Sequence, residues 1–370
     1  MNNKELYVGV MSGTSLDGID VALCETSGDT IKMIAHLTYP IPQSIKQSAL
    51  NMCLGQQTTL IDVGTLDHQL GQLYADAILQ LLQQESIPAE KVRAIGNHGQ
   101  TVFHQPNGGA PFTLQIGDAN IIAARTQIDT VADFRRKDMA LGGQGAPLVP
   151  AFHNTIFSST DSTVVVLNIG GIANISVLRP NSPVIGYDTG PGNMLMDIWC
   201  SEQKKEPYDQ DAQFALSGEV NIELLKHFLN EIYFSQPSPK STGRELFNLE
   251  WLNNKLAKFH VYPADVQRTL CELTATSICS EVELFSLGPS PELLVCGGGV
   301  SNPLLMQRLR ALLPSWKVQS TDDKGVSSDF MEAIAFAWLA QRRIHGLPSN
   351  LPEVTGASQQ ASLGVIYPAN

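Results

Sequence analysis

Short apolar segments alternate along this chain with longer segments in which apolar residues recur every three or four positions. The short segments are rich in β-branched residues and end near glycine, as buried strands do, and they span residues 6–10, 92–95, 164–169 and 293–295. The longer segments predict amphipathic helices over residues 58–84, 220–234, 263–285 and 331–344. Strands that alternate with helices of this length predict an α/β fold with parallel or mixed sheets.

One part of this pattern occurs twice. Residues 8–23 have the pattern of a strand, a turn of small residues and a second strand, and residues 165–177 repeat it about 155 residues later. This duplication predicts two domains of related topology, for which 370 residues leave room. The Pro, Ser and Gly residues of 234–244 interrupt the alternation, so this segment is either a linker or a mobile loop over a substrate.

The chain is acidic, with 24 Lys and Arg against 36 Asp and Glu and a net charge of −12. Only 16% of its residues are charged and 43% are hydrophobic, which excludes a disordered or coiled-coil chain. Because no basic excess exists to neutralise phosphates, we expect no nucleic-acid partner, and any anion must be held by backbone dipoles or a metal ion. No apolar segment has the ~18 residues of a membrane helix, no signal peptide is evident, and six scattered cysteines suggest reduced, mostly buried thiols. We therefore expect a cytoplasmic protein without a membrane partner.

Three turns of small residues follow predicted strands. They contain, in order, Ser12, Gly13, Thr14 and Ser15; Gly170 and Gly171; and Gly297, Gly298 and Gly299. Small residues let backbone N–H groups approach a phosphate or a flat ring, but each turn alone could equally be an ordinary connection. The chain has neither a Walker A lysine after the first turn nor the GxGxxG pattern of dinucleotide sites. Asp17 and Asp20 follow the first turn and could hold Mg²⁺ beside a phosphate.

A carboxylate follows another predicted strand. Asp188 comes directly after residues 183–187 and precedes a glycine-proline turn. It could cap the helix that is predicted to begin near Asn193. It could instead be a general base, because a rigid turn can fix a carboxylate so that it faces a cleft.

Polar side chains of the kind that bind sugars cluster at other strand ends. Residues 94–103 and 114–118 supply His98, Gln100, Thr101, Gln115 and Asp118. Their amides and hydroxyls can pair with sugar hydroxyls, although His98 could also be a core histidine. Arg135 and Arg136 belong either to a solvated face or to a site for a substrate carboxylate. Glu332, inside the apolar stripe of 331–344, is either on the solvent side of its helix or a buried polar anchor.

Taken together, these segments resemble the anhydro-N-acetylmuramic acid kinase family. The resemblance extends from about residue 8 to about residue 367 and rests on residues 11–20, 97–101, 132–136, 142–153, 168–174, 186–193, 240–245 and 296–299. It implies two duplicated actin-like (ribonuclease H-like) ATPase domains around a central cleft for nucleotide and substrate, in a cytoplasmic homodimer. The first domain would comprise residues 1–130 plus about 345–370, and the second residues 131–344.

The resemblance also implies a coupled reaction in peptidoglycan (cell-wall) recycling. Water opens the 1,6-anhydro bridge of 1,6-anhydro-N-acetylmuramic acid while ATP, with Mg²⁺, phosphorylates O6, giving N-acetylmuramic acid 6-phosphate and ADP. Asp188 is implied to be the base that takes a proton from the attacking water.

Other site residues follow from the same resemblance and from the motifs above. The first phosphate loop is implied to comprise Gly13, Thr14, Ser15, Leu16, Asp17, Gly18, Ile19 and Asp20, next to Ser12. Gly170 and Gly171 would belong to a second phosphate loop, and the turn at 297–299 would lie by the adenosine. For the sugar we assign His98, Gln100, Thr101, Gln115, Arg135, Arg136, Asn193 and Glu332, the lactyl carboxylate of muramic acid being a partner for an arginine.

One position departs from the wider superfamily. Most of its members have Asp two residues before the first-loop glycine, where this chain has Met11. The Mg²⁺ carboxylate must then come from elsewhere, with Asp17, Asp20 and Asp188 as candidates. Other functions considered are a kinase of an ordinary hexosamine, a non-catalytic sugar- or nucleotide-sensing module of the same fold, and a filament-forming actin-like protein.

Overall fold

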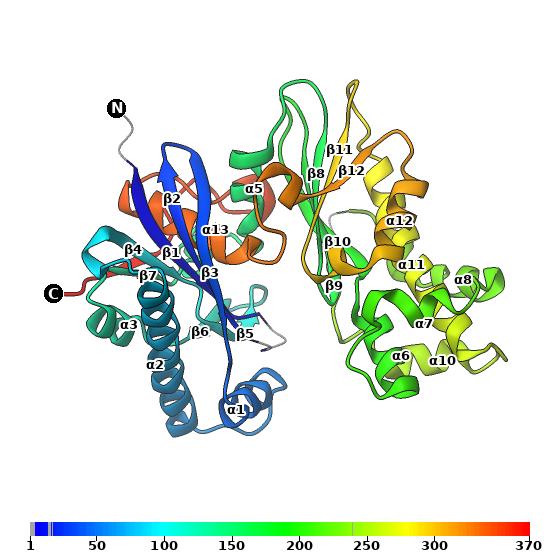
Figure 1. Cartoon of the computed structure of the whole chain (residues 1–370), viewed down its shortest axis with the longest axis horizontal. Coiled ribbons are helices and arrows are strands. Elements are labelled where there is room, and N and C mark those ends of the chain that lie inside the picture. The colour runs from blue at the N-terminus through cyan, green and yellow to red at the C-terminus, as the bar shows by residue number, and fades with distance from the viewer. Residues whose placement is uncertain (1–3, 14–15, 17, 239) are drawn as a thin grey trace. The chain divides into compact units, whose positions relative to one another are not determined.

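The computed structural model describes residues 4–13, 16, 18–238 and 240–370. The chain forms two compact units (Figure 1). One contains the chain up to Ile156 together with Phe330–Asn370, and the other contains Phe157–Asp329. Among the described residues, no helix combines the length and the apolar character needed to cross a bilayer.

The first unit is built on a six-stranded sheet of order β13-β7-β4-β1-β2-β3. Its strands are β1 (Glu5–Met11), β2 (Ile19–Ser27), β3 (Thr30–Tyr39), β4 (Val92–Asn97), β7 (Thr130–Ala132) and β13 (Val365–Tyr367). β1 pairs antiparallel with β2 and parallel with β4, β2 pairs antiparallel with β3, and β4 pairs parallel with β7. A separate hairpin joins β5 (Gln100–Gln105) to β6 (Phe112–Ile116). The helices are α1 (Gln43–Cys53), α2 (Leu60–Gln84), α3 (Ala119–Thr126), α4 (Arg136–Ala140), α5 (Val149–Phe157), α13 (Met331–Ile344) and α14 (Pro352–Thr355).

Helix α13 belongs to this unit and packs closely on its sheet. Val8 and Val10 of β1 belong to the core that α2 covers, so Gly9, between them, faces the other side of the sheet. There α13 approaches so closely that a Cβ on Gly9 would lie 1.8 Å from the Ala333 carbonyl oxygen. The expected assignment of residues 131–344 to the second domain therefore differs from the structure, in which the boundaries fall near Ile156 and Phe330.

The second unit repeats the arrangement of the first. Its five strands have the order β10-β9-β8-β11-β12 and are β8 (Val164–Ile169), β9 (Ile172–Leu178), β10 (Ile185–Pro191), β11 (Glu292–Cys296) and β12 (Lys317–Ser320). From β10 to β12 the pairings are antiparallel, antiparallel, parallel and parallel, as they are from β3 to β7 in the first unit. The duplication that the sequence predicted is confirmed by this shared strand order.

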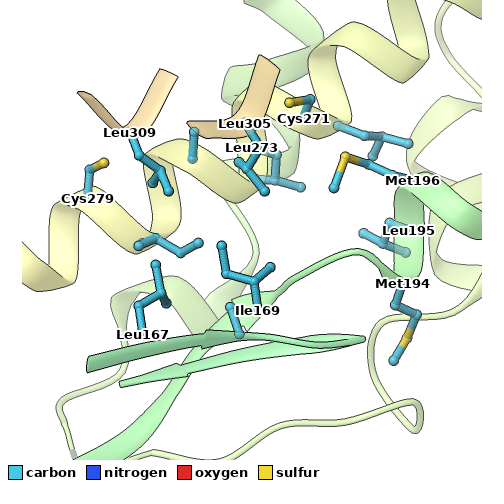
Figure 2. Packing of buried hydrophobic residues seen from close by; sticks show 14 of the residues in the cluster. Leu167, Ile169, Met194, Leu195, Met196, Cys271, Leu273, Cys279, Leu305 and Leu309 are labelled. Carbon is cyan, nitrogen blue, oxygen red and sulfur yellow. The ribbon is translucent and has the colours of Figure 1, made fainter. Parts of the chain in front are cut away.

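Helices cover the sheet of the second unit. They are α6 (Met194–Lys204), α7 (Gln213–Leu216), α8 (Ile222–Leu229), α9 (Ile232–Ser235), α10 (Leu249–Leu256), α11 (Pro263–Glu283) and α12 (Pro303–Leu312). Figure 2 shows Leu167 and Ile169 of β8 facing side chains of α11 and α12, such as Leu273 and Leu305. This packing fixes the end of β8, where the second glycine turn begins. Five of the six cysteines are buried, as expected, and Cys53 is exposed.

Two expectations need correction in this unit. The helix predicted over 220–234 is interrupted, because Glu231 accepts a hydrogen bond from the backbone of Ile232 and starts α9 as a new helix. The segment 234–244 lies inside the second unit rather than between the units, so the linker interpretation is wrong.

Candidate active site

In the first unit the candidate residues gather at one edge of the sheet. β1 runs parallel to β4, and β4 runs parallel to β7, so these three strands end at the same edge. Ser12 follows β1, His98 follows β4, and Arg135 comes shortly after β7. Ligands of open α/β sheets bind outside the carboxyl ends of the strands, so a substrate is expected at this edge.

Arg135 directs its guanidinium toward His98. Nε and Nη2 of Arg135 lie 3.2 and 2.9 Å from Nε2 of His98, and Nη1 donates to the carbonyl of Gly145 at 2.8 Å. Burial and the charge of Arg135 hold the pKa of His98 well below its usual value, so the imidazole is neutral and Nε2 accepts. Burial also lowers the pKa of Arg135 to about 10, against the opposing effect of Glu332. His98 is thus a buried, paired histidine, as one interpretation held, but it also lines a pocket.

Two carboxylates lie near the end of β1. Asp20, opposite Met11 in the β1–β2 pair, accepts a hydrogen bond from Thr38 Oγ1 at 2.8 Å. Glu332 is in the first turn of α13. Burial raises the pKa of Glu332, Arg135 lowers it, and Asp20 raises it further. Glu332 is therefore a polar anchor among charged groups, not a residue on an open solvent face.

Ser12 and Gln100 form a buried pair with Tyr74 of α2. Ser12 Oγ donates to Oε1 of Gln100 at 2.8 Å and lies 2.7 Å from the Tyr74 hydroxyl. Gln100 Nε2 donates to the carbonyl of Thr101 at 3.3 Å. These side chains therefore brace the first turn from within the protein, and a ligand-binding role for them stays a prediction.

A pocket of about 220 Å³ lies beside His98. His98, Gln115 and Arg136, three of the residues assigned to the sugar, are in its lining; its other polar side chains are Asp67, Asn97, Thr113, Asp118, Asn120, Asp133 and Tyr367. Gln115 Nε2 donates to Thr113 Oγ1 at 2.7 Å and to Thr101 Oγ1 at 3.1 Å. Arg136 Nε donates to Asp133 Oδ2 at 2.8 Å and is exposed. The lining supplies the mixture of donors and acceptors that hydroxyl groups require.

The first predicted phosphate loop is described only in part, since Thr14, Ser15 and Asp17 lie outside the described residues. The N–H of Leu16 donates to the carbonyl of Gly13 at 3.2 Å. Leu16 and Ile19 are fully buried and belong to the core of the first unit. A Cβ on Gly18 would lie 2.6 Å from Thr38 Cγ2, so packing within the protein explains this glycine.

In the second unit the two other glycine turns lie together. The backbone N–H of Asn193 donates to the carbonyl of Gly170 at 2.8 Å, and its side chain donates to the carbonyl of Ile169 at 3.2 Å. The nearest atom to a Cβ built on Gly298 would be Nδ2 of Asn193, at 3.8 Å. Asn193 was assigned to the sugar, but the structure places it beside the turns assigned to the nucleotide.

The glycines of these turns differ in what holds their place. A Cβ would meet nothing closer than 3.5 Å at Gly170, Gly171 and Gly298. At Gly297 and Gly299 it would approach side chains of β8 to 2.3 and 2.4 Å. Packing within the protein therefore requires glycine at 297 and 299. At Gly170, Gly171 and Gly298 a Cβ would make only ordinary van der Waals contacts, and Gly171 and Gly298 are exposed, so their backbone could be approached by a phosphate or a nucleotide.

Asp188 is held at three of its atoms in the middle of β10. Its backbone N–H donates to the carbonyl of Lys240 at 3.0 Å, and its carbonyl accepts from the hydroxyl of Tyr233 at 2.6 Å. Its Oδ2 accepts from the backbone N–H of Thr242 at 3.1 Å. Burial raises the pKa of Asp188 to about 6, with the Thr242 hydrogen bond lowering it and Glu245 raising it. A carboxylate with this pKa is suited to accept a proton near neutral pH.

The alternative role for Asp188 does not agree with the structure. The N-cap position of α6 is occupied by Asn193, without a side-chain capping hydrogen bond, and not by Asp188. The predicted strand 183–187 extends to Pro191, so Asp188 lies within β10 rather than at a helix start. The helix-cap interpretation is therefore wrong.

Two charged residues were missed by the sequence analysis. Lys240 is almost fully buried, and its Nζ lies 2.6 Å from Oε1 of Glu281. Asp138 is fully buried and accepts from the N–H of Gly145 and from the side chains of Asn350 and Thr355, all at 2.8 Å. Both residues occur in polar segments, where a charge suggests solvent exposure, and only a fold can bring them their partners.

Comparison with known proteins gives full-length matches. A family model described as anhydro-N-acetylmuramic acid kinase matches residues 5–369. The proteins of that name from Vibrio cholerae and Vibrio vulnificus are 67% and 65% identical, over 99% and 100% of this chain and the same shares of theirs. The activator of the 2-hydroxyisocaproyl-CoA dehydratase from Clostridium difficile, solved with bound ADPNP, is 10% identical with a TM-score of 0.42, covering 91% of this chain and 93% of that chain. Because this TM-score is low, the description of the fold rests on the strand order alone.

Proposed function

Because the chain belongs to the anhydro-N-acetylmuramic acid kinase family, we propose that it phosphorylates 1,6-anhydro-N-acetylmuramic acid at O6 as water opens the 1,6-anhydro bridge. The chain is a kinase, a phosphotransferase. The products are N-acetylmuramic acid 6-phosphate and ADP. The observation that carries the hydrolytic half is the Asp188 carboxylate, which is partly buried, held by the N–H of Thr242 and has a pKa of about 6.

Asp188 supplies the proton acceptor. As the water oxygen bonds to C1, the C1–O6 bond breaks, its electron pair stays on O6, and the water proton passes to the Asp188 carboxylate. O6 then bonds to the γ-phosphorus as the bond to the ADP oxygen breaks. Positioning and charge stabilisation supply most of the rate in such a transfer, so the fixed carboxylate fits the chemistry.

The glycine turns of the second unit are the proposed place for ATP. Gly171 and Gly298 are exposed, and packing within the protein does not require glycine at 170, 171 or 298, which fits a group that lies directly against the backbone.

Asp20 is the described residue that we propose for Mg²⁺. The described residues contain no group of three carboxylate, His or Cys side chains placed to bind a metal. Mg²⁺ on a nucleotide needs only one or two protein carboxylates, because phosphates and waters complete its shell. Asp20 also raises the pKa of Glu332, a repulsion that a nearby cation would relieve. When bound, Mg²⁺ would neutralise phosphate charge.

The pocket beside His98 is the proposed place for the amino sugar. Gln115 and Arg136 line it, and Arg136 carries the exposed guanidinium of the arginine pair. We assign the lactyl carboxylate to Arg136, because Nε, Nη1 and Nη2 of Arg135 are all directed at His98 and Gly145. A cytoplasmic homodimer that acts in peptidoglycan recycling completes the proposal.

Isotope labelling tests the coupled reaction. The enzyme is given ATP, Mg²⁺ and the anhydro sugar in ¹⁸O-water, and the product is analysed by mass spectrometry. We expect one ¹⁸O at C1 and ordinary oxygen in the ester bridge at O6. Unlabelled product incubated in the same water without enzyme corrects for exchange at C1.

Other outcomes identify the alternatives. If N-acetylmuramic acid is phosphorylated faster than its anhydro form, the protein is an ordinary hexosamine kinase. If ATP and sugar raise the melting temperature but no ADP forms, it is a sensing module. Sedimentable polymer formed on adding ATP would indicate a filament-forming protein. Each of these results overturns the proposal.

A further inference from the structure

A buried ion pair lies beneath Asp188. Lys240 and Glu281 join the 240–242 segment to α11, with side chains that are 2% and 11% exposed. Glu281 Oε2 also accepts from the hydroxyl of Tyr187, the residue before Asp188. The carboxylate of Glu281, on α11, thus contacts both β10, through Tyr187, and the segment 240–242, whose backbone contacts Asp188.

The ammonium group of Lys240 holds a third element. Its Nζ lies 3.3–3.4 Å from the carbonyls of Tyr233, Phe234 and Gln236, at the end of α9, and 5.0 Å from the centre of the Tyr233 ring. Cations are favoured at the carboxyl end of a helix, where carbonyl groups lack partners. Tyr233 in turn donates its hydroxyl to the carbonyl of Asp188.

Three paths therefore lead from this ion pair to Asp188. They run through Tyr187 to its backbone, through Tyr233 to its carbonyl oxygen, and through residues 240–242 to its N–H and its carboxylate. None of these contacts leaves the second unit.

We propose that Lys240 and Glu281 are positioning residues that set where the Asp188 carboxylate lies and keep the Thr242 N–H on it. The inference rests on the proposed function of Asp188 as the base. Stability alone does not account for the pair, because desolvating two charges costs as much as their attraction returns, and uncharged replacements are often no less stable.

The test compares single and double variants of the full-length enzyme. Lys240→Met alone leaves Glu281 buried without its cation, so it is paired with the double variant Lys240→Met/Glu281→Gln. The double variant removes both charges and keeps an acceptor for Tyr187. We expect the double variant to fold and its kcat to fall by about 10–100-fold, because small misplacements of a reacting group cost that much. KM for ATP should change less than about threefold.

The pH profile separates positioning from a structural role. The hydrogen bond from Thr242 lowers the pKa of Asp188. Its loss should therefore raise that pKa and move the acidic limb of kcat to higher pH. The single variant Lys240→Arg should retain at least half of the parental kcat, since it keeps a cation for Glu281. Arg308→Met is the matched control: it removes another cation paired with α11, 2.7 Å from Glu272, and should leave kcat and the limb unchanged.

A readout independent of turnover distinguishes failure of this inference from failure of the proposed function. Carbon-13 NMR titration of the Asp188 carboxyl, assigned by comparison with Asp188→Asn, should give a higher pKa in the folded double variant than in the parent. An unchanged pKa together with parental kcat would overturn the positioning role. A raised pKa in an enzyme that lacks the sugar kinase activity would retain that role and reject only the proposed reaction.

Discussion

The backbone N–H of Thr242 donates a hydrogen bond of 3.1 Å to Oδ2 of Asp188. This contact opposes burial, which raises the pKa of that carboxyl to about 6. The balance leaves Asp188 mostly ionised at neutral pH while its proton affinity stays above that of an ordinary aspartate. A general base requires this combination, because it must be deprotonated and must also have a high enough proton affinity to accept a proton.

The rate should therefore depend on pH through Asp188. Below pH 6 the base becomes protonated, so kcat should fall about tenfold for each further pH unit, with an apparent pKa near 6. Asp188→Asn should lower kcat by roughly 10²–10⁴ and abolish this limb, with KM for ATP retained. Steady-state ADP release from pH 5 to 8 measures both, and near-parental turnover of the variant would exclude Asp188 as the base.

The same residue should make the second unit less stable as pH rises. The unfolded carboxyl has a pKa of 3.8 and the folded one about 6, so between these values the folded state binds more protons. Stability should fall as pH rises through this window, and the cost should be fully present above pH 6. Asp188→Asn should then be more stable than the parent at pH 7.5, on the order of 1–3 kcal/mol, and equal to it below pH 4. Calorimetry at both pH values checks this, and a pH-independent difference would contradict it.

The two adjacent arginines should have separable roles. Arg136→Gln should lower kcat/KM for the anhydromuramic acid about 10–100-fold, the worth of a hydrogen bond between charged groups, because it loses the lactyl carboxylate. With 1,6-anhydro-N-acetylglucosamine, which lacks that carboxylate, it should change kcat/KM less than about threefold. Arg135→Gln should impair both sugars, because it removes the donors that hold His98. If Arg135→Gln, and not Arg136→Gln, removes the preference for the sugar with the lactyl carboxylate, then Arg135 binds that carboxylate and the assignment to Arg136 is wrong.

Close packing of α13 on the sheet can be tested with two glycines. A Cβ on Gly96 of β4 would lie 2.0 Å from the carbonyl oxygen of Phe336, so Gly96→Ala must displace the helix that carries Glu332. We expect a destabilisation of about 2 kcal/mol or more, as for other overpacked cores. Gly64→Ala is the control, since a Cβ there meets nothing within 4 Å in α2 and should stabilise by about 0.5–1 kcal/mol. Thermal unfolding of both variants gives the comparison, and equal effects would contradict the packing.

The periodicity predicted most of the fold. The strands at 164–169 and the helix at 331–344 agree with β8 and α13, because each has a long, uninterrupted apolar pattern. The break between α8 and α9 was not predicted, since the cap at Glu231 interrupts a helix without interrupting its apolar stripe. The domain boundary was also misplaced, because nothing local tells which sheet α13 covers.

The candidate site also has features that the sequence could predict and features that it could not. Asp188 and the glycine turns could be proposed from the sequence, because a carboxylate or a run of glycines at a strand end is a local pattern. The hydrogen bonds of Gln100 with Ser12 and of Asn193 with Ile169 could not be predicted, since each joins residues that are far apart in the sequence.

By itself the sequence determined the alternation of strands and helices, the duplication, the glycine turns and the family. These are properties of spacing and residue type, which short-range chemistry controls. Only the tertiary structure decided that Lys240 is buried against Glu281, that Arg135 turns to His98 while Arg136 stays exposed, and that a Cβ would clash at Gly297 but not at Gly298. These facts depend on which groups folding brings together and removes from water, and burial then sets both the pairing of charges and the pKa of the proposed base.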